Sequence, residues 1–395
     1  MTKGNKNKPK PAFAKSNGEP KKVFVGLSGG VDSSVSLALL KKAGYDVTGV
    51  FIKVWHPDWL PCDWKEERRD AMRVAAALDI PFLTFDLQKE YKEGVVDYML
   101  REYKNGRTPN PDVMCNKEIK FGGFLNKAIE MGADFIATGH YARITPPSGH
   151  PSYKQEGRRK LVEGVDKSKD QSYFLWNLGQ KELEHVLFPV GHLEKTEVRK
   201  LAKRFGLPTA EKKDSQGICF IGKVDMKEFL SHYIDSVPGI VLNELGKAIG
   251  NHDGAVFYTI GQRHGFSITE KTSNDDPYYV ISKDILKNTI TVSNKKNGQR
   301  PIGAVGVRLS DVNWVDVKPN DGKEYSCRLR YRQEKQKCKI ETPPRLADSA
   351  PLLGKGGEAE VFFTFPQGDV SPGQSLVIYD GEMCLGGGII NEVIY

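Results

Sequence analysis

The sequence predicts an α/β protein with an N-terminal parallel sheet, a small central α+β domain and a C-terminal β-barrel. From residue 23 to about residue 144, apolar strand-like runs alternate with helical patterns, which favours βαβ units and a parallel sheet. From Pro301 onward, strand patterns recur between Gly, Pro and Asp without a convincing helix, as is typical of a small barrel. At 395 residues the chain also exceeds one ordinary core. We therefore expect a tail and three domains, with boundaries at residues 1–22, 23–222, 223–298 and 299–395.

The tail is distinguished by its charge. Residues 1–22 hold seven Lys and one Glu, so they carry +6 of the formal net charge of +8. Their composition is typical of disorder, and the tail either attracts RNA phosphates without specificity or simply solubilises the chain. It has no Arg and no amphipathic period, which argues against organelle targeting. Without a membrane-length apolar run or a signal peptide, we expect a cytoplasmic protein with no membrane partner.

Each element of the first domain follows a local pattern. Apolar runs predict strands at residues 23–27, 47–54, 82–87 and 135–137, separated by helices near 33–43, 65–79, 89–104 and 117–131. A loop-rich region follows, with helices expected near 171–178 and 194–205. The central domain should hold a helix near 225–234 and short strands near 254–260 and 278–281.

The first strand ends in the run Ser28-Gly29-Gly30-Val31-Asp32-Ser33. Two glycines let the backbone curl with its N–H groups inward, and the helix that follows presents its positive end, so the run predicts a phosphate-binding loop. It lacks the Lys of the G-x-x-x-x-G-K-[ST] loop, and the chain has no G-x-G-x-x-G. Ile52 and Gly139 stand where two other strands end. Because ligands bind beyond the carboxyl ends of parallel strands, we expect a nucleotide site there.

Two of the six cysteines lie in informative surroundings. Cys115 falls near the first turn of a helix that Asn110 would cap and Pro111 would open. The helix end favours a thiolate, while Asp112 either opposes it or handles a proton beside it. Cys219 stands between Gly217 and Gly222. From local sequence alone, either thiol could equally be a buried structural one. No C-x-x-C occurs, so a zinc ribbon or a thioredoxin-like dithiol is not expected.

A basic segment near the C-terminus suggests RNA contact. In Cys327-Arg328-Leu329-Arg330-Tyr331-Arg332, alternation would place three Arg on one face of a strand. Lys335, Lys337 and Lys339 follow on what would be the paired strand. Such a hairpin suits phosphate and base contact, although a charged strand face is more often simply solvated.

Several motifs occurring in order resemble those of the tRNA-specific 2-thiouridylase family (MnmA type), within the PP-loop ATP pyrophosphatases. Besides the Ser28 run they are Gly106-Arg107-Thr108-Pro109-Asn110-Pro111-Asp112, Cys115-Asn116-Lys117-Glu118-Ile119-Lys120-Phe121, Ala137-Thr138-Gly139-His140-Tyr141, Lys169-Asp170-Gln171-Ser172-Tyr173-Phe174, Gly217-Ile218-Cys219-Phe220-Ile221-Gly222, Thr259-Ile260-Gly261-Gln262-Arg263, Arg330-Tyr331-Arg332, Pro372-Gly373-Gln374-Ser375 and Cys384-Leu385-Gly386-Gly387-Gly388. The resemblance covers nearly everything after the tail.

The resemblance implies a fold and a reaction. The first domain would be an adenine nucleotide alpha hydrolase-like, Rossmann-like PP-loop domain, and the barrel would contact tRNA. ATP with Mg²⁺ would adenylate the C2 oxygen of the wobble uridine in a tRNA anticodon. Cys219 would carry a persulfide sulfur from a donor protein. Cys115 would act as the nucleophile that helps release this sulfur, leaving a Cys115–Cys219 disulfide, with Asp112 as candidate acid or base.

The resemblance also implies a monomer, and it assigns no residue of the chain as a metal ligand. It does assign residues that bind ATP and tRNA. Those for ATP are Gly26, Leu27, Ser28, Gly29, Gly30, Val31, Asp32, Ser33, Ile52 and Gly139. Those for the tRNA are Asn110, Pro111, Asp112, His140, Lys169, Asp170, Gln171, Arg330, Tyr331 and Gln374. Two departures stand out, because the family often has Met in place of Ile52 and a longer acidic loop where residues 56–64 stand.

Three alternatives remain open from the sequence. Another PP-loop ligase or amidotransferase would not need both Cys115 and Cys219. An RNA-binding relative without catalysis would be expected to have lost the loop or a cysteine. In a third version, Cys115, Cys219 and Asp112 hold an iron–sulfur cluster.

Overall fold

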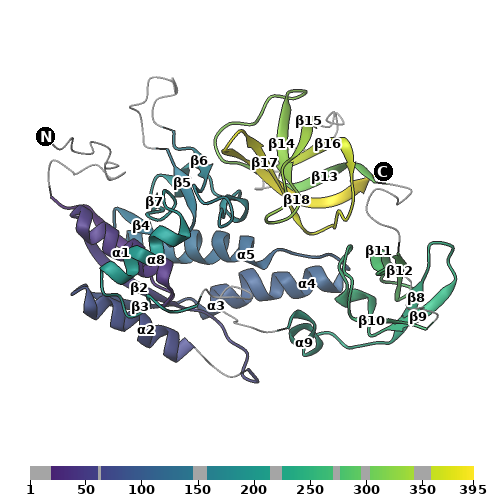
Figure 1. Cartoon of the computed structure of the whole chain (residues 1–395), viewed down its shortest axis with the longest axis horizontal. Coiled ribbons are helices and arrows are strands. Elements are labelled where there is room, and N and C mark those ends of the chain that lie inside the picture. Colours follow the sequence, from purple (N-terminus) through teal and green to yellow (C-terminus); the bar gives the residue numbers. More distant parts are fainter. Residues whose placement is uncertain are drawn as a thin grey trace, which may run out of the picture.

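The computed structural model describes residues 19–60, 64–145, 158–213, 225–269, 276–294, 303–341 and 357–395. Over these residues the strands form three sheets (Figure 1). The parallel sheet and its helices lie at one end of the molecule, and the barrel and the small central domain lie at the other. Within the described ranges, no helix is long and apolar enough to cross a membrane.

The N-terminal sheet is entirely parallel, with the order β3-β2-β1-β4-β7. Its strands are β1 Lys22–Gly26, β2 Asp46–Lys53, β3 Phe82–Asp86, β4 Phe135–Ala137 and β7 Val186–Leu187. The four predicted strands are confirmed, each to within one residue at either end. Val23 and Val25 face one apolar layer and Phe24 faces the other. Because both faces are covered, the interior of β1, from Val23 to Val25, is apolar.

One face of this sheet carries three of the predicted helices, which are confirmed. They are α1 Val31–Ala43, α2 Trp64–Ala77 and α8 Lys195–Arg204. Val35, Val74 and Val198 bring them into one core with β1. Helix α1 ends at Gly44, which takes a left-handed φ of 92°.

The other face carries two long helical segments that both contain a π-helical stretch (Figure 1). The first consists of α3 Gln88–Tyr91, η1 Lys92–Asp97 and α4 Tyr98–Lys104, and the second of α5 Pro111–Met114, η2 Cys115–Gly123 and α6 Phe124–Glu130. They approach closely, since a Cβ on Gly94 would lie 3.0 Å from Glu118 Cγ. Both predicted helices are confirmed, although the second begins at Pro111 rather than near residue 117.

The helix predicted near residues 171–178 is wrong. Only a 3₁₀ turn, η3 Ser172–Phe174, forms there, and α7 Gln180–Leu183 follows it. The Asp170 carboxylate accepts the backbone N–H of Ser172 and thereby occupies a donor at the start of this segment. Tyr173, Leu175 and Trp176 are all buried, so the segment lies in the core instead of presenting one apolar face.

The central domain is a five-stranded sheet with the order β10-β9-β8-β12-β11. Its elements are α9 Met226–Ser231, β8 Gly239–Leu242, β9 Ala248–His252, β10 Phe266–Ile268, β11 Tyr279–Asp284 and β12 Thr289–Ser293. The predicted helix and the strand near 278–281 are confirmed. The strand expected at 254–260 is wrong, because a 3₁₀ turn, η4 Ala255–Phe257, replaces it. Asn288 Oδ1 accepts the N–H of Ala255 at 2.9 Å and fixes this turn.

The predicted C-terminal barrel is confirmed and closed. Its strands have the order β13-β16-β15-β14-β17-β18, and pairing of β13 with β18 completes the ring. They are β13 Ala304–Trp314, β14 Glu324–Arg328, β15 Gln336–Glu341, β16 Gly357–Gln367, β17 Ser375–Asp380 and β18 Met383–Ile394, and β18 also pairs with β6 Leu161–Glu163, which pairs with β5 Ala142–Ile144. A Cβ on Gly386 would lie 2.1 Å from the carbonyl oxygen of Asn313. The closing pair therefore requires glycine there.

The basic hairpin is confirmed as a pair of strands, but its three-Arg face is wrong. Strand β14 ends at Arg328, so Arg330 and Arg332 lie in the turn before β15. Gln333 Oε1 accepts the N–H groups of Leu329 and Arg330 at 2.8 and 3.2 Å. These bonds close the turn where the alternation predicts continued strand.

Candidate functional site

The loop between β1 and α1 is tight and well ordered by hydrogen bonds. Gly29 has a φ of 71°, and a Cβ there would lie 2.7 Å from the carbonyl oxygen of Glu67. The hydroxyls of Ser33 and Ser34 both donate to Gly30 O, at 3.2 and 2.7 Å. The first N–H groups of α1 have no acceptor within their own helix, so this end suits an anion.

The ends of three strands meet beside this loop. A Cβ on Gly26 of β1 would lie 3.9 Å from Cδ1 of Ile52 in β2 and 3.8 Å from the carbonyl oxygen of Ala137 in β4. The three strands therefore end side by side. A Cβ on Gly139 would lie 2.7 Å from the N atom of Ser33. Hence Gly139 lies against the start of α1, where a larger residue would not fit. Helix N–H and hydroxyl donors beside the apolar Ile52 fit an adenine nucleotide, so the residues predicted for ATP do come together.

Two residues that sequence reasoning missed complete this end of α1. Lys195 Nζ lies 2.8 Å from both carboxylate oxygens of Asp32. The Tyr141 hydroxyl donates to Asp32 Oδ1 at 2.7 Å. Tyr141 belongs to the motif of residues 137–141, but nothing in the local sequence around Lys195 indicates a partner 163 residues earlier.

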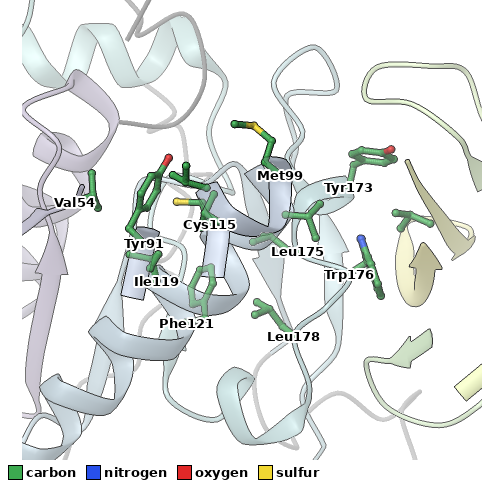
Figure 2. Packing of buried hydrophobic residues seen from close by; sticks show 14 of the residues in the cluster. Val54, Tyr91, Met99, Cys115, Ile119, Phe121, Tyr173, Leu175, Trp176 and Leu178 are labelled. Carbon is green, nitrogen blue, oxygen red and sulfur yellow. The ribbon is translucent and has the colours of Figure 1, made fainter. Parts of the chain in front are cut away.

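The second centre is the segment that carries Cys115. Asn110 caps α5 by accepting the N–H of Val113 at 3.3 Å, and Pro111 occupies the first helical position, both as predicted. Asp112 lies half-buried one turn before Cys115, so the two residues share a helix face. Cys115 is fully buried, and Figure 2 shows its sulfur beside Tyr91 in an apolar cluster.

A short series of contacts links the two centres. Gly139 lies against Ser33, and the ring of the next residue, His140, lies 5.7 Å from that of Phe121, on the same π-helical segment as Cys115. His140 is buried. Burial, with Lys120 nearby, lowers the pKa of His140 well below its ordinary value, so this imidazole is neutral at pH 7.

The segment before Cys115 lies at the junction of all three domains. Thr108 donates its N–H to Pro372 O at 2.8 Å, and its hydroxyl lies 3.2 Å from that of Thr259. Gln374 Nε2 donates to the carbonyl oxygens of Thr108 and Pro109 at 2.9 and 3.3 Å. These bonds tie the barrel and the central domain to the segment that leads to Cys115.

The remaining residues predicted to face tRNA divide into two groups. Arg330 donates to the carbonyl oxygens of Ile260 and Asp369, both at 2.7 Å, and so bridges the central domain and the barrel. Asp170 is buried, and its carboxylate accepts from Arg328 at 2.8 Å. Both, like His140 and Gln374, are engaged within the protein.

A groove of about 430 Å³ is instead open to solvent and bears mostly cations; it is lined by Lys167, Ser168, Lys169, Asp170, Arg328 and Arg332. Gln171 and Tyr331 are half-buried next to this region.

Cys219 lies outside the described residues, so the structure does not test its pairing with Cys115. Among the residues that are described, no group of three His, Cys, Asp or Glu side chains is arranged to hold a metal ion.

Comparison with known proteins places the chain in a family. Family models match the tRNA methyl transferase HUP domain at residues 21–223, the tRNA methyl transferase PRC-barrel domain at 227–294 and the aminomethyltransferase beta-barrel domain at 305–390. The tRNA-specific 2-thiouridylase MnmA 2 of Geobacillus kaustophilus is 46% identical over 375 residues, which are 94% of this chain and 95% of that protein.

Two further relatives agree. The tRNA-specific 2-thiouridylase MnmA of Halalkalibacterium halodurans is 45% identical over 95% of this chain and 96% of its own length. The MnmA of Streptococcus thermophilus is 43% identical over 94% and 95%. Such identity over nearly the full length of each protein establishes common ancestry and fold, and the chain accordingly belongs to the tRNA-specific 2-thiouridylase family.

Proposed function

We propose that this protein converts the wobble uridine of certain tRNA anticodons to 2-thiouridine with ATP and Mg²⁺. The observation that carries the proposal is the run of contacts from the loop at Ser33, through Gly139 and His140, to the helix of Cys115. A site for activating a carbonyl and a thiol for sulfur chemistry thus belong to one continuous structure. ATP supplies the chemistry that turns the C2 oxygen into a leaving group.

The residues of the chain divide the work. Backbone N–H groups and hydroxyls of residues 26–33 hold the phosphates, and Ile52 and Gly139 line the nucleotide. The cationic groove and Tyr331 receive the anticodon stem-loop, while residues 110–112 contact the target base. Asp112 moves a proton at the thiol or the base. Arg330, Gln374, His140 and Asp170 orient the segments that make these contacts.

Sulfur transfer is a balanced exchange between two cysteines. A persulfide donor protein loads Cys219, and the terminal sulfur of this persulfide forms the new bond to C2 as AMP departs. The Cys115 thiolate attacks the Cys219 sulfur, which breaks the S–S bond and leaves a Cys115–Cys219 disulfide. A thiol reductant then returns both cysteines to thiols. We expect a monomer, because residues of a single chain form the three-domain junction at Thr108, and a cytoplasmic location, because the proposed substrate is tRNA.

Nucleoside mass spectrometry tests the proposal directly. Unmodified tRNA is incubated with the protein, Mg-ATP and a persulfide donor. We expect 2-thiouridine from the wild type and from Cys384→Ala, a control for a buried cysteine in the barrel. We expect none from Cys115→Ala or Cys219→Ala.

Other products would point to another function. AMP formation that depends on tRNA but yields no thiolated nucleoside would replace the proposal by another adenylating reaction. Binding of tRNA without any ATP turnover would reduce the protein to an RNA-binding relative. Iron and an absorption band of an iron–sulfur cluster in anaerobically purified protein would favour the alternative mechanism, in which Cys115, Cys219 and Asp112 hold such a cluster.

A further inference from the structure

Lys195 is placed at the phosphate-binding end of α1 from a distant part of the chain. Its Nζ lies 2.8 Å from both oxygens of Asp32, the second residue of α1. The side chain of Lys195 is only 13% exposed and that of Asp32 is 30% exposed. This ammonium group is therefore next to the loop and partly shielded from water.

The position of Lys195 is fixed by its surroundings. Lys195 is the first residue of α8, and its backbone N–H donates to Asp166 Oδ2 at 3.0 Å. Val198 of the same helix packs in one core with Val35 of α1. Because α1 and α8 share this core, the lysine is held at the loop by packing as well as by its ion pair.

The loop needs a cation that its own sequence does not provide. Residues 26–33 contain one charged side chain, the acidic Asp32. A triphosphate approaching α1 would meet this carboxylate, so the helix end alone does not balance the charges. Lys212 also lies near the loop, but it pairs with Asp70 at 2.7 Å. Lys195, by contrast, pairs directly with Asp32 of the loop.

We propose that Lys195 is the phosphate-binding lysine of this site, specific for the part of ATP that leaves as pyrophosphate. In the nucleotide-free protein it neutralises Asp32. When ATP binds, the Lys195 ammonium contacts the β- and γ-phosphoryl oxygens. Asp32 then becomes available to the Mg²⁺ that accompanies ATP. This inference rests on the proposed use of ATP and adds a residue to it.

A binding measurement that separates the phosphates tests this role. Calorimetry of the full chain compares α,β-methylene-ATP with AMP, both in the presence of Mg²⁺. Because Lys195→Met removes a charge-assisted hydrogen bond to the triphosphate, this variant should bind α,β-methylene-ATP about 10- to 100-fold more weakly. Binding of AMP, which has no β- or γ-phosphate, should stay within about two-fold by the same reasoning.

Two further variants guard the interpretation. Lys195→Gln can still donate to Asp32, so it preserves the local fold while it removes the charge, and it should show the same selective loss if the methionine variant does not fold. Lys200→Met, at an exposed position of the same helix, should bind both ligands like the wild type.

Two results would overturn the role of Lys195 alone. One is an equal loss of affinity for both ligands, which would make the lysine a purely structural partner of Asp32. The other is an unchanged affinity for α,β-methylene-ATP. A wild-type protein that binds neither ligand would instead defeat the proposed use of ATP, and this inference with it.

Discussion

Buried polar side chains hold the loops around the site in their conformations. Asp170 accepts the N–H groups of Gly164 and Ser172 at 3.0 and 3.1 Å, and it pairs with Arg328 at 2.8 Å. The buried Glu163 also pairs with Arg328, at 3.1 Å. Removing one member of such a buried pair typically costs about 3–5 kcal/mol. We interpret Asp170 as a residue that orients its neighbours on either side toward the groove.

His140 makes the stability of the protein depend on pH. Burial and the charge of Lys120 lower its pKa far below the ordinary 6.5. The folded protein therefore binds fewer protons than the unfolded chain below pH 6.5, and stability falls as the pH drops through that value. His192 and His252 are shifted in the same direction, chiefly by burial, so His140 accounts for part of the effect.

Replacing His140 by Asn should reduce this dependence. The free energy of unfolding, measured with urea at pH 7.5, 6.0 and 5.0, should fall less steeply in His140→Asn, by up to about 1.4 kcal/mol per pH unit below pH 6.5. His264→Asn, at an exposed position, is the matched control and should keep the wild-type slope. An unchanged slope in His140→Asn would mean that His140 is protonated in the folded protein.

At the scale of elements, the turn before β17 contacts the segment that leads to Cys115. Gly373 has a φ of 92°, and a Cβ there would lie 2.8 Å from both N and O of Thr108. Gly381, in the turn between β17 and β18, also has a positive φ, of 59°, but a Cβ there would meet nothing within 4 Å. Both glycines therefore have a backbone conformation that strains other residues, but only Gly373 also contacts the segment that leads to Cys115.

This difference predicts different effects of the same substitution. Gly373→Ala and Gly381→Ala should each lose at least about 1 kcal/mol of stability, since alanine is strained at positive φ. Gly373→Ala should lose more than this, because its Cβ also clashes with the backbone of Thr108, and only this variant should displace Thr108 and slow thiolation, by at least about 10-fold for a shift near 1 Å at the reacting groups. Initial rates and melting temperatures of both variants test this. Equal rates in the two variants would show that the contact with Thr108 does not position the segment that leads to Cys115.

The sequence predicts those elements whose stability is local. The interior of β1 is apolar, and α1 follows directly from its glycine turn, so both are found within a residue or two of their predicted bounds. The segment 171–178 fails because tertiary burial and the Asp170 carboxylate override its helical pattern. The pairing of Lys195 with Asp32 depends on how α8 packs on α1, which no local pattern encodes.

At the scale of the whole molecule, one apolar cluster joins the three domains. It contains Cys115 and Phe121 from the N-terminal domain, Phe229 from the central domain and Val377 from the barrel. Trp59 also packs against it, stacked on His232 of the central domain with ring centroids 3.7 Å apart. The Cys115 thiol thus lies in a core shared by all three domains, and exposing it requires a change that involves more than one of them.

Site-resolved alkylation should detect this change. Cys115, Cys327, Cys338 and Cys384 are all buried. Because the thiolate must be reached by the reagent, we expect iodoacetamide to modify all four much more slowly in the free protein than it modifies glutathione. Sulfur transfer requires Cys115 to become accessible, so tRNA with AMP, which permits no reaction, should accelerate its labelling at least about 10-fold. Cys327 and Cys338 lie in the separate core of the barrel and should remain protected, which makes them internal controls. Labelling of all four together would indicate unfolding. Unchanged protection of Cys115 would mean that tRNA binding alone leaves the shared core closed, and that exposure of this thiol depends on a later step.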